Sequence, residues 1–196
     1  MGSTRAGRIC PDVTAWVARL CPASTGFACE IVDLADWRLP MDDEPAIPAL
    51  GPYDQPHTRA WSERVDSAVA VVLVTPQYNW GYPAVLKNAI DHLYREWRNK
   101  PVVVVTYGGH GGTRCARQLR RVGSCLKMRI ASTTPALVLR EAVIRGTATL
   151  DIERDFGRYC TTVQSAFEEL ARMVDGRESL AARLRRRWRA LCAAAT

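Results

Sequence analysis

The sequence is poor in the side chains that usually carry acid–base, nucleophilic or metal chemistry. It has three histidines in 196 residues, and its seven cysteines form no CxxC pair. No stretch gathers histidine, cysteine and carboxylate residues at the spacing of a catalytic or metal-binding cluster. We therefore predict no metal site and no catalytic side chain. His57 has no evident partner and is expected to be a surface histidine.

Long apolar runs are also missing. No stretch approaches the roughly 20 apolar residues that a membrane-spanning helix needs, and no apolar signal segment follows Met1. We therefore expect a cytoplasmic protein without a membrane span, whose cysteines are free and mostly buried thiols. With 47% hydrophobic and 24% charged residues, the composition is typical of a globular chain, and the length suits one α/β domain.

The formal net charge of +7 is concentrated near the C-terminus, where residues 177–189 contain six arginines and one glutamate. Four apolar residues share one side of a helix in this tail: Leu180, Leu184, Trp188 and Leu191. The pattern predicts a basic amphipathic helix over residues 176–196, after a domain that spans residues 1–175. This helix either packs in solvent against the domain or a partner, or contacts a membrane surface or nucleic acid. Because the rest of the chain is close to balanced in charge, we predict no nucleic-acid partner.

The chain is organised around a strand, a polar loop and a helix that follow one another over residues 69–94. Residues 69–74 form a continuous apolar run rich in β-branched side chains, which is typical of a strand buried on both faces. Residues 101–107 repeat this strand pattern and lead into a glycine-rich loop, residues 108–112. Ligands of open α/β sheets bind just beyond the carboxyl ends of the strands. The loops after the two strands are therefore candidate binding segments.

Alternating strand and helix patterns predict a three-layer α/β domain with a parallel sheet. Strands are expected near residues 27–34, 69–75, 101–107 and 130–138, and Pro135 in the last one indicates an edge position or a bulge. Helices are expected after Pro11, around residues 57–68, over residues 83–98, after Gly112 and over residues 151–174. Residues 38–56 hold five of the eleven prolines. They predict an irregular connection that either borders a pocket or serves as a linker.

Three short motifs together resemble the NADPH-dependent FMN reductase family, which has a flavodoxin-like fold and includes quinone and azo-compound reductases. The first is Pro76-Gln77-Tyr78-Asn79, followed by Gly81-Tyr82-Pro83, Leu86-Lys87-Asn88 and Asp91. The second is Gly2-Ser3-Thr4-Arg5 with Arg8, which resembles the family's phosphate loop. The third is residues 107–112, YGGHGG, which resembles its second flavin-contacting loop. The resemblance covers roughly residues 2–175, and the order and spacing of the motifs make it specific.

The resemblance implies an enzyme that uses FMN and either NADPH or NADH, with the chemistry carried by the flavin rather than by a catalytic residue. Hydride would pass from NAD(P)H to the flavin and on to a quinone, an azo compound, free flavin or a similar acceptor. The implied flavin-binding residues lie in three loops: Ser3, Thr4, Arg5 and Arg8; Pro76, Gln77, Tyr78 and Asn79; and Gly108, Gly109, His110, Gly111 and Gly112. His110 is either a substrate contact or a solvent-facing loop residue.

The resemblance also implies a homodimer, possibly paired further into a tetramer. The expected helix over residues 83–98 carries apolar residues on more than one side, and a surplus beyond one stripe usually meets another surface. We predict that Tyr94 and Trp97 are buried near the contact. The alternative is that residues 38–56 or the tail helix cover this surplus within one chain.

One departure from the family is serious. The phosphate loop normally follows a first, central strand, and here only Met1 precedes it. Without that strand, two neighbouring strands lose their ladder partner. Either the sequence begins downstream of the protein's true start, or the second and third strands of a real variant pair directly. Two alternative functions therefore stay open: a non-catalytic electron carrier, or a degenerate flavodoxin-like protein that holds no flavin.

Overall fold

The computed structural model describes the backbone of residues 1–193 and the side chains of residues 1–176. It contains an open parallel sheet of four short strands: β1 (Val71–Pro76), β2 (Pro101–Gly108), β3 (Arg129–Ile130) and β4 (Ala136–Val138). β1 pairs with one edge of β2 from Val71 opposite Val102 to Pro76 opposite Tyr107, and β3 and β4 both pair with the other edge. The predicted parallel α/β fold is confirmed.

The predicted last strand is present, but it is interrupted. β3 pairs with the start of β2 and β4 with its end, and the residues between them leave the ladder. Pro135, which has no N–H to donate, lies in this interruption, and its carbonyl still accepts a hydrogen bond from the Thr106 N–H at 3.0 Å. The expectation of a bulge or an edge position at Pro135 is therefore confirmed.

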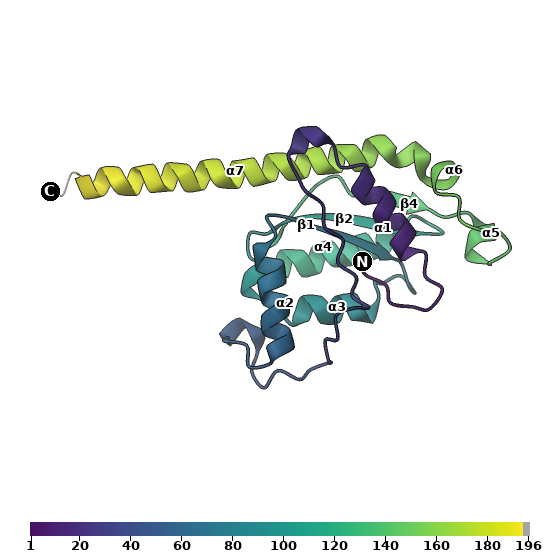
Figure 1. Ribbon diagram of the computed structural model, residues 1–196, viewed down its shortest axis with the longest axis horizontal. Helices are drawn as coiled ribbons and strands as arrows, with labels where there is room; N and C mark the ends of the chain where they lie inside the picture. The colour runs from purple at the N-terminus through teal and green to yellow at the C-terminus, as the bar shows by residue number, and fades with distance from the viewer. Residues whose placement is uncertain (194–196) are drawn as a thin grey trace.

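Helices cover both faces of the sheet (Figure 1). α1 (Cys10–Arg19) and α7 (Cys160–Ala193) lie on one face, and α2 (Pro56–Ser67), α3 (Ala84–Asp91) and α4 (Thr113–Cys125) lie on the other. The side chains of β2 alternate between the two cores. Val103 and Val105 pack with α1 and α7, whereas Val102 and Val104 pack with α2, α3 and α4. This explains why β2 has four consecutive valines, residues 102–105, rather than alternating apolar and polar residues.

Shorter elements connect these layers: η1 (Ala23–Thr25), η2 (Pro48–Leu50), η3 (Arg95–Trp97), α5 (Glu141–Ile144), α6 (Ile152–Phe156) and η4 (Gly157–Tyr159). The helix predicted over residues 151–174 therefore begins in two short pieces before α7. Residues 176–193 are helical, as predicted for the tail, but they continue α7 without a break and do not form a second helix. The side chains of that tail lie outside the described residues, and the division into two domains stays a prediction. No helix in the described part of the chain is both long and apolar enough to span a membrane.

The helix predicted over residues 83–98 ends early, at Asp91, and the 3₁₀ turn η3 follows. Leu93 and Trp97 are 1% and 2% exposed within the single chain, and the Trp97 indole N–H donates to the Ile90 carbonyl at 2.9 Å. Leu34, Leu39 and Tyr53 belong to the same core. The apolar surplus is thus covered by the chain itself, so it no longer argues for a partner. The homodimer stays a prediction.

The strand predicted over residues 27–34 does not form. Residues 27–33 have no regular secondary structure, Leu34 begins a turn, and none of them pairs with a strand, so β1 is an edge of the described sheet. Direct pairing of the second and third predicted strands is therefore wrong as well. A cavity of about 550 Å³ separates the segment from β1, and it reaches from Phe167 on one face to Trp61 on the other. A strand needs a ladder partner at hydrogen-bonding distance, and this gap removes it.

Candidate functional site

The polar loop after β1 forms a tight turn. Tyr78 and Gly81 exchange two backbone hydrogen bonds of 2.9 Å, and the residues between them, Asn79 and Trp80, have φ values of 46° and 70°. Two consecutive residues in the left-handed region are typical of a type I′ turn, and asparagine tolerates this conformation better than most residues. The turn places Asn79 and Trp80 at an exposed tip beyond the carboxyl end of β1.

Tyr78 joins the N-terminal loop to this turn. The Ser3 hydroxyl lies 2.8 Å from the Tyr78 hydroxyl, and Ser3 is fully buried. The Arg5 guanidinium lies 3.9 Å from the centroid of the Tyr78 ring, a distance at which a cation is attracted to an aromatic face. Thr4 and Arg5 are exposed. The structure therefore brings Ser3 and Arg5 to the edge of the sheet predicted from the sequence.

Gln77 joins the same turn to the glycine-rich loop. Its backbone N–H donates to the Tyr107 carbonyl at 2.9 Å, and its side-chain oxygen accepts a hydrogen bond from the Cys115 N–H at 3.2 Å. Cys115 lies in the first turn of α4, which begins directly after Gly112. Pro76 is buried at the end of β1. The three predicted loops thus meet at one edge.

Two glycines of the third loop are required by the protein's own packing. Gly111 and Gly112 have φ values of 68° and 77°, and a Cβ atom on them would lie 2.8 Å from the Ala136 carbonyl oxygen and 2.7 Å from the Thr106 Cβ. The family resemblance implied that these glycines contact the flavin. The structure gives a nearer reason, because neither position accepts a side chain even without a ligand. Gly108 is half-buried, whereas Gly109 and His110 are exposed.

The site has backbone donors to offer at both ends. Within the described chain, no backbone hydrogen bond is made by the N–H groups of residues 3–5 in the first loop or of residues 109 and 110 in the third. The arginine side chain of the first loop adds a positive charge, and α4 directs its N-terminal end toward the third loop. Such an edge can hold an anionic group at one end and the polar rim of a flat ring at the other.

Arg8 stands apart from the other predicted residues. Its guanidinium is paired with the Asp33 carboxylate, and its Nε is buried without a hydrogen-bond partner. The ion pair neutralises much of the charge that a phosphate group would attract. Arg8 is therefore the weakest of the predicted phosphate contacts.

Two features of the site were not predicted from the sequence. The Arg114 guanidinium lies 3.5 Å from the centroid of the Trp80 ring, and Trp80 is 61% exposed. The only available sequence signal was an arginine in the first turn after the glycine-rich loop. Burial raises the pKa of the Cys115 thiol to about 12, which keeps this cysteine protonated at neutral pH and unreactive beside the site.

These observations define a class of protein. An open parallel sheet with helices on both faces, whose polar and glycine-rich loops meet beyond the carboxyl ends of the strands, is the architecture of flavodoxin-like nucleotide-binding domains. The sequence pattern of the NADPH-dependent FMN reductase family matches residues 1–139. The chain belongs to this family, and the resemblance seen in its motifs is confirmed.

Individual relatives agree with this assignment. The chain is 47% identical over 178 residues to an NAD(P)H-dependent FMN reductase of Schizosaccharomyces pombe, an alignment that covers 89% of this chain and 88% of the relative. It is 33% identical over 130 residues to a quinone reductase of Escherichia coli, covering 62% of this chain and 65% of that protein. The solved structure of the flavoenzyme NAD(P)H:(acceptor) oxidoreductase FerB from Paracoccus denitrificans has a TM-score of 0.65 at 19% identity, over 89% of this chain and 94% of the other. This last likeness supports the fold alone.

The residues present fit the cofactor that the family name implies. FMN carries a phosphate at one end and a polar pyrimidine ring at the other. The unpaired N–H groups and the guanidinium of the first loop suit the phosphate, and the unpaired N–H groups of the third loop suit the pyrimidine rim. The polar turn of residues 77–79 lies between them.

Proposed function

We propose that this chain is an FMN-dependent NAD(P)H oxidoreductase that reduces a small acceptor such as a quinone. The observation that carries the proposal is the meeting of three loops with unpaired donors beyond β1 and β2, in a chain that belongs to the NADPH-dependent FMN reductase family. When FMN is bound, it supplies the redox chemistry by which reducing equivalents from NADPH or NADH reach the acceptor.

The chain's own residues bind and orient in this proposal. The backbone N–H groups of Ser3 and Thr4 and the guanidinium of Arg5 hold the phosphate. Gln77 is fixed by its two hydrogen bonds, so it positions the turn that carries Asn79 against the middle of the cofactor. The N–H groups of Gly109 and His110 donate toward the pyrimidine rim, where they stabilise added negative charge. No side chain is needed as an acid or a base.

The exposed pair of Trp80 and Arg114 lies beside this edge and suits the second substrate. An exposed indole offers a flat apolar surface to a nicotinamide or a quinone, and the guanidinium stacked on it keeps a positive charge near a dinucleotide phosphate. We further propose that the protein acts in the cytoplasm as a homodimer or tetramer. The proposed acceptor is a quinone, an azo compound or free flavin.

The test begins with the colour of the purified protein and the consumption of NADPH or NADH in the presence of FMN and a quinone. Asn79→Ala and Arg5→Ala are each expected to weaken FMN binding at least about tenfold, because each removes about 1.5–3 kcal/mol of hydrogen bonding or charge interaction. Asn99→Ala is the matched control for Asn79, since Asn99 also has a positive φ, of 59°. Arg19→Ala, which removes an exposed ion pair with Glu153, is the control for Arg5.

The outcomes separate the proposal from its two rivals. A chain that binds FMN but consumes neither NADPH nor NADH is an electron carrier. A chain that binds no FMN is a degenerate member of the family, and the cavity beside β1, which lies next to the first loop, favours this second candidate. Unchanged FMN affinity in both Asn79→Ala and Arg5→Ala removes these residues from the site.

A further inference from the structure

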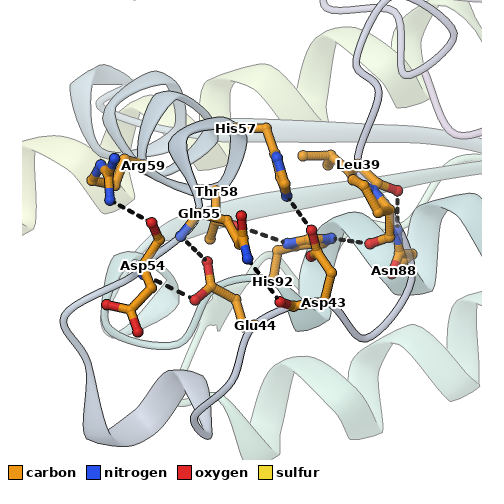
Figure 2. A network of polar contacts seen from close by, with 11 residues as sticks. Leu39, Asp43, Glu44, Asp54, Gln55, His57, Thr58, Arg59, Asn88 and His92 are labelled. Atoms are coloured by element: carbon orange, nitrogen blue, oxygen red, sulfur yellow. Dashed lines mark hydrogen bonds and ion pairs between the residues drawn. The ribbon is translucent and has the colours of Figure 1, made fainter.

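Three potential metal ligands meet on the helical face that carries α2 and α3 (Figure 2). Asp43 belongs to the irregular segment of residues 38–56, His57 to the first turn of α2, and His92 to the C-terminal end of α3. One side-chain ligand atom of each residue lies within 4.8 Å of those of the other two. Residues from three separate parts of the chain thus converge, away from the loops that we assign to FMN.

Two of these residues have unsatisfied buried atoms. The His57 Nε2 lies at ion-pair distance, 2.8 Å, from the Asp43 Oδ2. The other carboxylate oxygen, Asp43 Oδ1, is buried without a hydrogen-bond partner, and the His57 Nε2 has no contact with hydrogen-bond geometry. Buried polar atoms are nearly always paired, and the exceptions need a reason such as a bound ion. A cation bound between the two residues would give both of these atoms a partner, once the 2.8 Å contact opens to make room for it.

The third residue is already held in the manner of a metal ligand. His92 is 6% exposed, and its Nδ1 lies 3.0 Å from the Thr58 hydroxyl. That hydroxyl also contacts the Glu44 carboxylate. A carboxylate that orients a histidine through its second ring nitrogen is a common supporting contact of metal sites. The Nε2 now donates to the Pro40 carbonyl at 2.8 Å, so metal binding requires the ring proton to move to Nδ1, where Thr58 accepts it.

We propose that Asp43, His57 and His92 form a site for a divalent transition-metal ion of the Zn²⁺ class, which fastens residues 38–56 to α2 and α3. Two imidazoles and a carboxylate are ligands that Zn²⁺ accepts, with water in the fourth position. The side chains of His57 and Asp43 are 28% and 25% exposed, which leaves a route for the ion and for that water. This proposal reverses the expectation, drawn from the sequence, that the chain has no metal site.

The geometry needs a small adjustment. Ligand atoms about 2.0–2.2 Å from a tetrahedral Zn²⁺ lie roughly 3.3 Å apart. The three ligand atoms now lie within 4.8 Å of one another, and the 2.8 Å contact between His57 and Asp43 must lengthen slightly. Asp43 is on an irregular segment and His57 is in a first helical turn, so both can move toward His92, which is fixed by Thr58.

The test uses the full chain, freed of metal with a chelator and titrated with Zn²⁺ by calorimetry. We expect one Zn²⁺ per chain at this site and a rise in melting temperature of about 5–10 °C at a hundredfold excess over the dissociation constant. Asp43→Asn and His57→Gln should each weaken binding by more than about tenfold, and Thr58→Val by about 10- to 100-fold through His92. Asp42→Asn is the matched control, because Asp42 is the exposed neighbour of Asp43.

Free cysteines also bind Zn²⁺, and Cys29 and Cys125 are exposed. The experiment must therefore show whether the metal ligands are thiolates or nitrogen and oxygen atoms. Co²⁺ in place of Zn²⁺ should give visible ligand-field bands, without the strong ultraviolet thiolate bands that cysteine ligands add. Zn²⁺ affinity equal in Asp43→Asn, His57→Gln and Asp42→Asn, or thiolate bands as the sole signal, overturns the proposal. Flavin absorbance is recorded separately, so failure of the metal site and failure of the FMN site are distinguishable.

Discussion

We predict that the cavity beside β1 accepts one more strand, and this can be tested by adding one. The Met1 amino group donates to the Val32 carbonyl at 2.6 Å, while the Gly2 N–H donates to the Val74 carbonyl at 2.8 Å. Consecutive residues that bond in opposite directions are the pattern of a strand between two neighbours. On its unpaired edge, the part of β1 that precedes Val74 borders the cavity, so its free carbonyl and N–H groups are available to a new strand.

The perturbation is a fusion of five aliphatic, mostly β-branched residues to the amino end of Met1. Burial of five such side chains contributes about 1.5–3 kcal/mol each, and ordering five residues costs about 1–2 kcal/mol each for the backbone and about 0.5–1 for the side chain. New ladder hydrogen bonds add about 1 kcal/mol each. We expect a net gain of about 2–5 kcal/mol in the free energy of unfolding, which corresponds to about 5–15 °C in melting temperature.

The assay is thermal unfolding followed by circular dichroism, and the control is a fusion of the same length with alternating lysine and glutamate. Burial lowers the pKa of the Met1 amino group, and both fusions replace this buried group with a peptide bond. The difference between them therefore reports the strand alone. If the two fusions melt at the same temperature, the cavity does not accept a strand. Raised FMN affinity in the aliphatic fusion would further link the cavity to the first loop.

The remaining predictions concern two sets of polar contacts, one buried and one at the surface. The Lys100 ammonium is 3% exposed and donates to the carbonyls of Val65, Asp66 and Ala68 at 2.9, 3.2 and 2.6 Å, at the C-terminal end of α2. Lys100→Met should lower the free energy of unfolding by about 3 kcal/mol, because it leaves these carbonyls unpaired; a loss below about 1 kcal/mol in urea unfolding contradicts this. Glu169 accepts hydrogen bonds from the N–H groups of Ser132 and Thr133. Burial opposes its ionisation, but these bonds prevail and lower the pKa of Glu169 to about 2. A carboxylate whose pKa is lowered in the folded state stabilises it above the unfolded pKa near 4.5, and this contribution is lost as the pH falls from about 4.5 to about 2. Glu169→Gln should therefore cost about 1 kcal/mol at pH 7, allowing for solvent screening, and little at pH 2.5; an equal cost at both pH values refutes the assignment.

The sequence predicted those parts of the fold that depend on local pattern. The apolar run of β2 is explained by burial on both faces, and the helix after Gly112 by its regular apolar positions. The strand predicted over residues 27–34 failed because a strand exists only with a partner, and the partner is set by the whole sheet. Likewise, the sequence did not show what covers Trp97, because Tyr53, which belongs to the same core, lies far from it in the chain.

The two sites differ in how far the sequence could reveal them. Two of the three loops of the proposed FMN site could be located from motifs, because they directly follow β1 and β2 and the topology of a parallel sheet brings them together. The cluster of Asp43, His57 and His92 has no such rule, since Asp43 lies on a segment without periodicity and its approach to His57 depends on how that segment packs. His57 was predicted to be a surface histidine without a partner, and it is half-buried against Asp43.

The segment of residues 38–56 also supports the proposed FMN site indirectly, through its contacts with α3. The proposed metal site would fasten residues 38–56 to α2 and α3, and the Asn88 amide, which donates to the Leu39 carbonyl at 2.8 Å, also joins this segment to α3. α3 in turn begins four residues after Trp80, at the end of the polar turn. These contacts hold the C-terminal half of α3 and therefore limit the motion of the helix that directly follows the polar turn. Metal binding is expected to stabilise the fold more than it changes FMN affinity, because no residue that makes these contacts reaches the three loops.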